Sequence, residues 1–142
     1  MHATSAAVAV AATFVWLGMV LAISFLEAPL KFRAPDVTVR IGLGIGRLVF
    51  RALNRVEAVL ATVVVAAVAG GDPPVAVAVL AAIPVVLLAV QLTAVRPVLN
   101  RRSDRVMAGK EVPRSHAHLV YVACESAKAV TLLVLGTVTL HG

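Results

Sequence analysis

Several residues that can do chemistry lie inside long apolar runs of this chain. The polar and ionisable residues in these runs are Asn54, Glu57, Gln91, Tyr121, Glu125 and Lys128. In a lipid environment such groups are costly, so they usually face the protein interior, pair with one another and mark functional sites. We therefore predict that they form a pocket that binds a ligand or a proton. In this pocket Glu57 and Glu125 would accept a proton or cation, and the nearby charge of Lys128 would tune their pKa values.

The spacing of the polar residues supports a shared helical face. The last apolar segment carries His118, Tyr121, Glu125 and Lys128 in steps of three, four and three residues. Side chains spaced in this way lie on one side of a helix. Asn54 and Glu57, three residues apart on an earlier segment, share a face for the same reason. The sequence thus predicts that separate helices point polar groups at one place.

A metal site is a second possibility for the same region. Carboxylate and imidazole groups from different bundle helices are common ligands of non-haem metals. Glu27, Glu57, His118 and Glu125 can supply them, and copper, iron and manganese fit this ligand set equally well. The Glu-x-x-His pairs of ferritin-like di-iron bundles are absent, which counts against that particular centre.

A purely structural role is the alternative to both. Glu57 or Glu125 could pair with Lys128 and Arg55 only to fix the register of the helices, and a buried ion pair is weak evidence for stability. Three acids, one histidine and one tyrosine are more than register requires, which favours a functional pocket. The sequence has no Ser-His-Asp or Cys-His constellation, so hydrolase chemistry has little support.

The elements that carry these residues are predicted to be membrane-spanning helices. The chain of 142 residues is 61% hydrophobic and only 14% charged, too apolar to cover a water-soluble surface. A lone helix satisfies its backbone hydrogen bonds in lipid, whereas an open strand does not. We predict an all-α integral membrane four-helix bundle, a single domain over residues 1–142. The predicted spans are roughly 6–28, 46–70, 74–96 and 116–140, with the first helix ending at Pro29 because proline disfavours its continuation.

The positive charges predict the orientation of the bundle. Of the 13 Lys and Arg residues, six lie between Lys31 and Arg55, six between Arg96 and Arg114, and the last is Lys128. Cytoplasmic loops of membrane proteins carry such excesses. Both clusters should therefore face the cytoplasm from the inner membrane, with both termini and the Gly70–Pro74 turn outside. The net charge of +6 then serves topology and contact with anionic lipid, and no nucleic-acid partner is expected.

The two halves of the chain match each other at a shift of 68 residues. This shift superimposes Pro29 on Pro97, Arg33 on Arg101, Asp36 on Asp104 and Glu57 on Glu125 without a gap. The matches fall on proline and charged positions, where a chain rich in apolar residues produces the fewest matches by chance. They predict two pseudo-repeated helical hairpins related by an axis along the membrane normal, with Glu57 and Glu125 at equal depth.

A few residues carry a resemblance to known families. They are Gly18 and Pro29 in the first helix, and Thr93, Pro97 and Asn100 after the third. With them the chain resembles two groups of small four-span membrane proteins, the transmembrane-protein-205-like group and the anthrone-oxygenase-like group. The resemblance covers part of the chain and implies a compact four-helix bundle that acts on, or exports, a small or hydrophobic compound. Glu125 and Lys128 map to neither family, so it implies no catalytic residue.

The sequence leaves three functions open. The leading one is the binding or translocation of a small molecule or ion in a polar pocket near the cytoplasmic side. The second is a membrane-embedded, metal-dependent oxidoreductase with a lipophilic substrate, and the third is a non-catalytic subunit of a membrane complex. Besides the bilayer and a small or lipophilic molecule, we expect a second copy of the chain or a membrane-complex partner, because so small a bundle leaves little room for a transport path.

Overall fold

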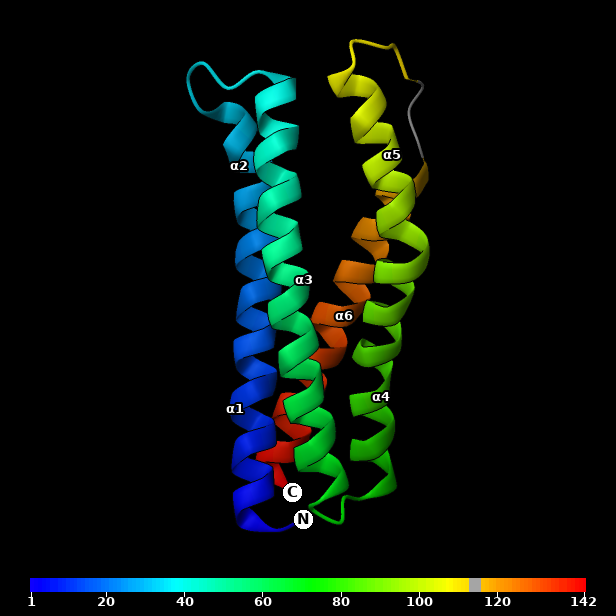
Figure 1. The fold of residues 1–142 in the computed structure, drawn as a ribbon. Coiled ribbons are helices and arrows are strands. Elements are labelled where there is room, and N and C mark those ends of the chain that lie inside the picture. Colours follow the sequence, from blue (N-terminus) through cyan, green and yellow to red (C-terminus); the bar gives the residue numbers. More distant parts are fainter. Residues whose placement is uncertain (113–115) are drawn as a thin grey trace.

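All regular secondary structure in the described part of the protein is helical. The computed structural model describes residues 1–112 and 116–142, and within them it contains helices and no strands. Figure 1 shows the resulting bundle. The all-α prediction is confirmed. Arg114, which ends the second basic cluster, and Ser115 lie outside the described residues.

The helical elements join into four long helices. In chain order they are α1 (Ala3–Val20), η1 (Leu21–Glu27), α2 (Ala28–Leu30), η2 (Lys31–Arg33), α3 (Val39–Ala69), α4 (Val75–Val90), η3 (Gln91–Val95), α5 (Arg96–Met107) and α6 (His116–His141). The segments η1 and η3 are π-helical, and η2 is a short 3-10 helix. Among the described residues, the four continuous helices Ala3–Arg33, Val39–Ala69, Val75–Met107 and His116–His141 are long and apolar enough to cross a membrane. They indicate a multi-pass membrane protein.

The predicted end of the first helix at Pro29 is wrong. The helix continues to Arg33, because the turn before the proline widens: the Ala28 amide donates to the Ile23 carbonyl, five residues back. Proline removes its own backbone donor and its ring crowds the carbonyl four residues earlier, and this wider π turn accommodates both effects. The third helix likewise runs past Pro97 to Met107, and α3 already begins at Val39, where the Thr38 hydroxyl accepts from the Ile41 amide at 3.2 Å.

The helices are longer than the bilayer core requires. A helix of 31 residues, such as Val39–Ala69, is about 46 Å long at about 1.5 Å per residue, against a hydrocarbon core of about 30 Å. The long helices must therefore tilt or extend beyond the hydrocarbon. The limits of the membrane spans within these helices stay a prediction.

Each helix packs against two others around a common core. The helix α1 contacts α3 and α6, and α4 contacts the same two helices, so α3 and α6 are diagonal partners. The core of the bundle contains Trp16, Val20, Val64, Leu132 and Leu135, each almost fully buried. Other apolar side chains point outward on every long helix, among them Val15, Val59, Val86 and Leu133. Such an apolar exterior fits a lipid surrounding.

The two ends of the bundle differ in charge. In Figure 1 both termini lie at the same end as the turn between α3 and α4, and α2 and α5 lie at the opposite end. The amide of His2 donates to the carbonyl of Gly71 at 3.1 Å and ties the N-terminus to that turn. The described part of both basic clusters consequently belongs to the end formed by α2, α5 and the first half of α3, which we call the basic end.

Candidate functional site

A buried ammonium group joins two helices that lie diagonally across the bundle. Lys128 of α6 is fully buried, and its Nζ lies 2.7 Å from Oε1 of Glu57 on α3 and 2.6 Å from Oε1 of Glu125 on its own helix. The same nitrogen donates to Oε1 of Gln91 at 2.8 Å. An ammonium group has three donors, and here each has one acceptor.

Further donors surround the two carboxylates. The indole of Trp16 donates to Oε1 of Glu57 at 3.1 Å, and the amide nitrogen of Gln91 donates to Oε1 of Glu125 at 2.7 Å. The hydroxyl of Ser24, in η1, donates to Oε2 of Glu125. We call Trp16, Ser24, Glu57, Gln91, Glu125 and Lys128 the polar centre. All four long helices contribute to it.

The polar centre combines high burial with charge. Glu57 and Glu125 are each 1% exposed and Lys128 is 0% exposed. Charges in such a place are tolerated only when they are paired and hydrogen-bonded. Two carboxylates share one ammonium group, so with all three ionised this trio carries one net negative charge.

A cavity of about 510 Å³ lies between the polar centre and the basic end. Its lining comes from η1, α2, η2, α3, α5 and α6, and comprises Ser24, Phe25, Ala28, Pro29, Lys31, Phe32, Gly42, Leu43, Gly46, Arg47, Phe50, Arg96, Leu99, Asn100, Arg102, Ser103, His118, Tyr121 and Val122. Ser24 belongs to the lining and also bonds to Glu125. One hydroxyl therefore connects the cavity to the polar centre.

Cations and aromatic rings alternate in this lining. The guanidinium carbon of Arg96 lies 4.6 Å from the Phe50 ring centroid and 4.7 Å from that of Tyr121. The two rings meet edge to face at 5.6 Å. The ammonium of Lys31 lies 5.5 Å from the centroids of Phe32 and Phe50. Such contacts hold cations in place on apolar surfaces, and a Cβ on Gly42 or Gly46 would collide with Phe32 or Lys31.

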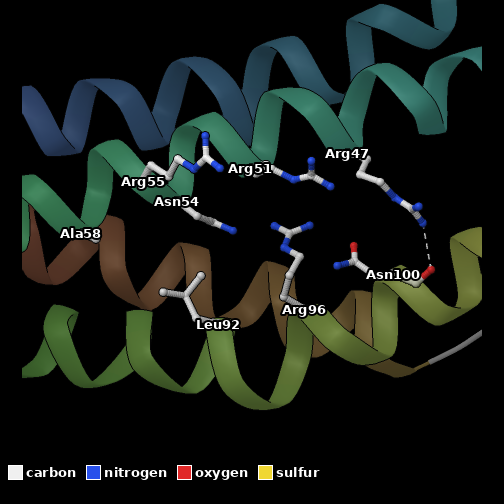
Figure 2. Close-up of a pocket in the computed structure, with 8 residues that line it drawn as sticks. All are labelled: Arg47, Arg51, Asn54, Arg55, Ala58, Leu92, Arg96 and Asn100. Carbon is white, nitrogen blue, oxygen red and sulfur yellow. Dashed lines mark hydrogen bonds between the residues drawn. The ribbon is translucent and has the colours of Figure 1, made fainter.

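A second hollow, of about 330 Å³, lies between α3 and the helix formed by η3 and α5. It is lined by Arg47, Arg51, Asn54, Arg55, Ala58, Leu92, Arg96 and Asn100. Figure 2 shows the α3 side chains along one wall and Arg96 and Asn100 facing them from α5. We call this hollow the arginine groove. Arg47 closes one end of it by donating to Asp104 at 2.7 Å and to the Asn100 carbonyl at 3.1 Å.

The residues predicted to bind a ligand are distributed over these three places. Glu57, Glu125, Lys128 and Gln91 meet in the polar centre. Tyr121 lines the cavity, and Asn54 lines the arginine groove and belongs to neither of the other two.

The four predicted metal ligands are not gathered into one site. Glu27 lies 3.6 Å from Lys31, His118 is an exposed residue at the edge of the cavity, and only Glu57 and Glu125 approach each other, through Lys128. Over residues 1–112 and 116–142, no group of three or more His, Cys, Asp or Glu side chains is placed to hold a metal ion. The metal hypothesis gains no support from this arrangement and stays a prediction.

Ser24 lies close to one line with Thr13, Val20 and Glu27 on the first helix, a spacing that predicts a polar face towards the pocket, and the structure places its hydroxyl on Glu125. Neither Trp16 nor Arg96 was assigned to a site from the sequence. Trp16 shares a buried helix face with Thr13 and Val20 in steps of three and four. This spacing could have placed its indole beside the acids. Arg96 belongs to a basic cluster whose pattern indicated topology only, and nothing in the sequence shows that it stacks on Phe50 and Tyr121.

Comparison with known proteins adds no assignment. No protein-family model matches the chain, and neither a curated protein nor a solved structure matches it. The resemblance to the transmembrane-protein-205-like and anthrone-oxygenase-like groups therefore rests on five residues alone and stays an expectation.

Proposed function

We propose that this protein binds or translocates a small molecule or ion at the cavity next to the polar centre, and that Glu57 and Glu125 accept the proton or cation that accompanies it. The observation that carries the proposal is the buried pair of carboxylates sharing one lysine, linked by Ser24 to a cavity of about 510 Å³. A polar site of this kind inside a membrane protein is expected to be functional.

Charge balance supports a proton or cation as part of the cycle. The ionised trio of Glu57, Glu125 and Lys128 has one more negative than positive charge. In surroundings of low polarity an unbalanced charge is expensive. One added proton or monovalent cation brings the net charge of the trio to zero. A second lysine in the centre would have balanced the charge without an added proton or cation.

A role limited to helix register fits the site less well. An ion pair that only locks helices needs one acid and one base. Here a second acid, a glutamine, an indole and a hydroxyl also converge on the same atoms, and the hydroxyl belongs to the wall of a cavity. A connection of this kind lets an event in the cavity reach Glu125.

We also propose that the basic end faces the cytoplasm from the inner membrane and that the chain arose by duplication. The positive clusters at the basic end, carried mostly by η2, α3 and α5, support the orientation. The duplication is supported by two π-type hydrogen bonds, Ala28 to Ile23 and Arg96 to Gln91, which occupy equivalent positions at the 68-residue shift.

The only tryptophan of the chain provides a direct test. Because the Trp16 indole touches Glu57, its fluorescence should respond when the polar centre gains a proton or cation. We would titrate protein in phosphatidylcholine nanodiscs with acid and with sodium and potassium chloride. The emission of Trp16 should change in the wild type, and the transition should be lost in Glu57→Gln and displaced in Glu125→Gln.

The matched control is Glu111→Gln, which removes an exposed acid outside the helices. It should behave as the wild type. The role of the carboxylates is refuted if the Trp16 emission of the wild type does not change with protons or with either cation. Equal responses of Glu125→Gln and Glu111→Gln would refute it as well.

A second arm of the experiment tests the cavity. Benzoate, an aromatic anion, suits a lining of cations and rings, and its binding should alter the Trp16 emission. Gly46→Leu puts bulk into the cavity wall and should abolish the benzoate response while leaving the response to protons. If Gly46→Leu binds benzoate as the wild type does, the cavity is not the binding site.

A further inference from the structure

The arginine groove holds more positive charge than its surroundings neutralise. Arg51 and Arg55 from α3 and Arg96 from α5 line it together with Arg47. Of these four arginines, only Arg47 forms an ion pair within the described residues, and its partner is Asp104. One Nη atom of Arg96 is buried and has no hydrogen-bond partner among the described residues. Three guanidinium groups from two helices therefore face one hollow, and no carboxylate of residues 1–112 or 116–142 pairs with them.

The polar lining beside these arginines suits an anion with several oxygen atoms. Asn54 and Asn100 add amide groups on opposite walls, as Figure 2 shows. Guanidinium groups present planar pairs of donors that match the oxygen atoms of a phosphate. A single carboxylate would leave most of these donors unused, so a phosphate group is the better match.

The groove also has an apolar end. Ala58 of α3 and Leu92 of η3 line it on the side away from Arg47, as Figure 2 shows. Arg51, Arg55 and Ala58 are themselves exposed on the outside of the protein. A molecule with a phosphate group at one end and an apolar chain at the other can thus reach the groove from the surrounding lipid.

We propose that the arginine groove is a binding site for a phosphate group, delivered by an anionic phospholipid of the leaflet at the basic end. Its phosphate lies between Arg51, Arg55 and Arg96, and its acyl region follows Leu92 and Ala58. This site is separate from the polar centre and does not depend on the function proposed for it. Because Arg96 also lines the large cavity and stacks on Tyr121, an occupied groove fixes one wall of that cavity.

Native mass spectrometry of protein released from mixed vesicles tests the site. The vesicles contain phosphatidylcholine with a minor share of phosphatidylglycerol, and the retained lipids are counted for the wild type, Arg51→Gln, Arg55→Gln and Arg96→Gln. We expect selective retention of phosphatidylglycerol by the wild type, weakened about fivefold for each arginine removed, the factor that corresponds to about 1 kcal/mol per cation near an anionic surface. Arg40→Gln, which removes an exposed arginine of α3 outside the groove, should retain phosphatidylglycerol as the wild type does.

A competition arm distinguishes a lipid from a free phosphate. If inorganic phosphate displaces phosphatidylglycerol and binds on its own, the site takes the phosphate group from either source. If inorganic phosphate has no effect while the arginine variants lose the lipid, the lipid is the ligand. Equal retention of both lipids by the wild type, or equal loss in Arg40→Gln and Arg51→Gln, overturns the proposal. Should Arg96→Gln fail to fold because its ring contacts are lost, Arg51→Gln and Arg55→Gln decide, since among the described residues the cations stacked on aromatic rings are Lys31 and Arg96.

Discussion

Lys128 determines the state of the polar centre, because within the described residues it is the cation paired with both Glu57 and Glu125. Its three donors are all used, two on carboxylates and one on Gln91. A neutral side chain at this position would leave two carboxylates sharing a dry site. The lysine therefore acts as the counter-ion of both acids.

Replacing this lysine should destabilise the fold strongly. We expect Lys128→Met to lower the free energy of unfolding by about 3–5 kcal/mol, the usual cost of breaking a buried ion pair from one side. Adding Glu57→Gln and Glu125→Gln to it removes the uncompensated charge and should restore most of the loss. Thermal unfolding in detergent micelles measures both, with Lys110→Met, at an exposed lysine, as the control. A triple variant no more stable than Lys128→Met would contradict the charge argument.

The ion pair of Arg47 and Asp104 should matter far less. Its side chains are 27% and 60% exposed, and solvent screens pairs of this kind. Asp104→Asn should therefore change the unfolding free energy by no more than about 1 kcal/mol. The same micelle unfolding assay compares it with Lys128→Met, and a larger loss would mean that the pair holds α3 and α5 together.

The residues of the candidate site could be predicted from the sequence to different degrees. Glu57, Gln91, Glu125 and Lys128 stand out because polar groups are rare in apolar runs, and the structure brings them into contact. Trp16 does not stand out, since an indole is ordinary in a membrane helix. Arg96 joins the site only through its aromatic stacking, which depends on how α5 packs and leaves no mark in the local sequence.

Two π-helical segments set the direction of side chains near the polar centre. The segments η1 and η3 each come just before a proline, Pro29 or Pro97, and each contains a polar-centre residue, Ser24 or Gln91. A π turn holds one more residue than an α turn, so the side chains beyond it are rotated relative to a regular helix. The sequence predicted a helix end at Pro29, because the rule for proline considers its missing amide and not the possibility of a wider turn.

Deleting one residue tests this view of η3. Removal of the exposed Thr93 should turn η3 into regular α-helix and leave the helices on either side in register, so unfolding should stay cooperative. Removal of the exposed Val79 from α4 should instead rotate one part of the helix by about 100° against the other and take Val77 or Ala81 out of the core. Circular dichroism melting in micelles compares the two variants. An equal loss of thermal stability in both would show that η3 does not contain an extra residue relative to a regular α-helix.

At the scale of the whole molecule, the division between an apolar body and one basic end was the strongest signal in the sequence. Composition and charge clusters predicted an all-helical membrane protein with four helices able to span a bilayer, and the structure confirms this. The cavity could not be predicted, since its lining is assembled from η1, α2, η2, α3, α5 and α6. How these segments pack against one another determines the cavity, and hydropathy does not report their packing.

Cysteine labelling tests the orientation of the molecule. In a Cys124→Ser background, which removes the only natural cysteine, Asp72→Cys and Lys110→Cys place one thiol at each end. A membrane-impermeant maleimide added to intact cells should label Asp72→Cys directly and Lys110→Cys only after permeabilisation. The reverse pattern would place the basic end outside and contradict the positive-inside argument.

Lys128 has no counterpart in the first half of the chain, where Leu60 stands 68 residues earlier. Two copies of the first hairpin would bring together two acids and no equivalent of Lys128, and two copies of the second would supply one lysine for each acid. On the duplication proposed above, neither kind of homodimer reproduces a centre in which two acids share one lysine. Each half of the chain then supplies a part of the centre that the other half lacks.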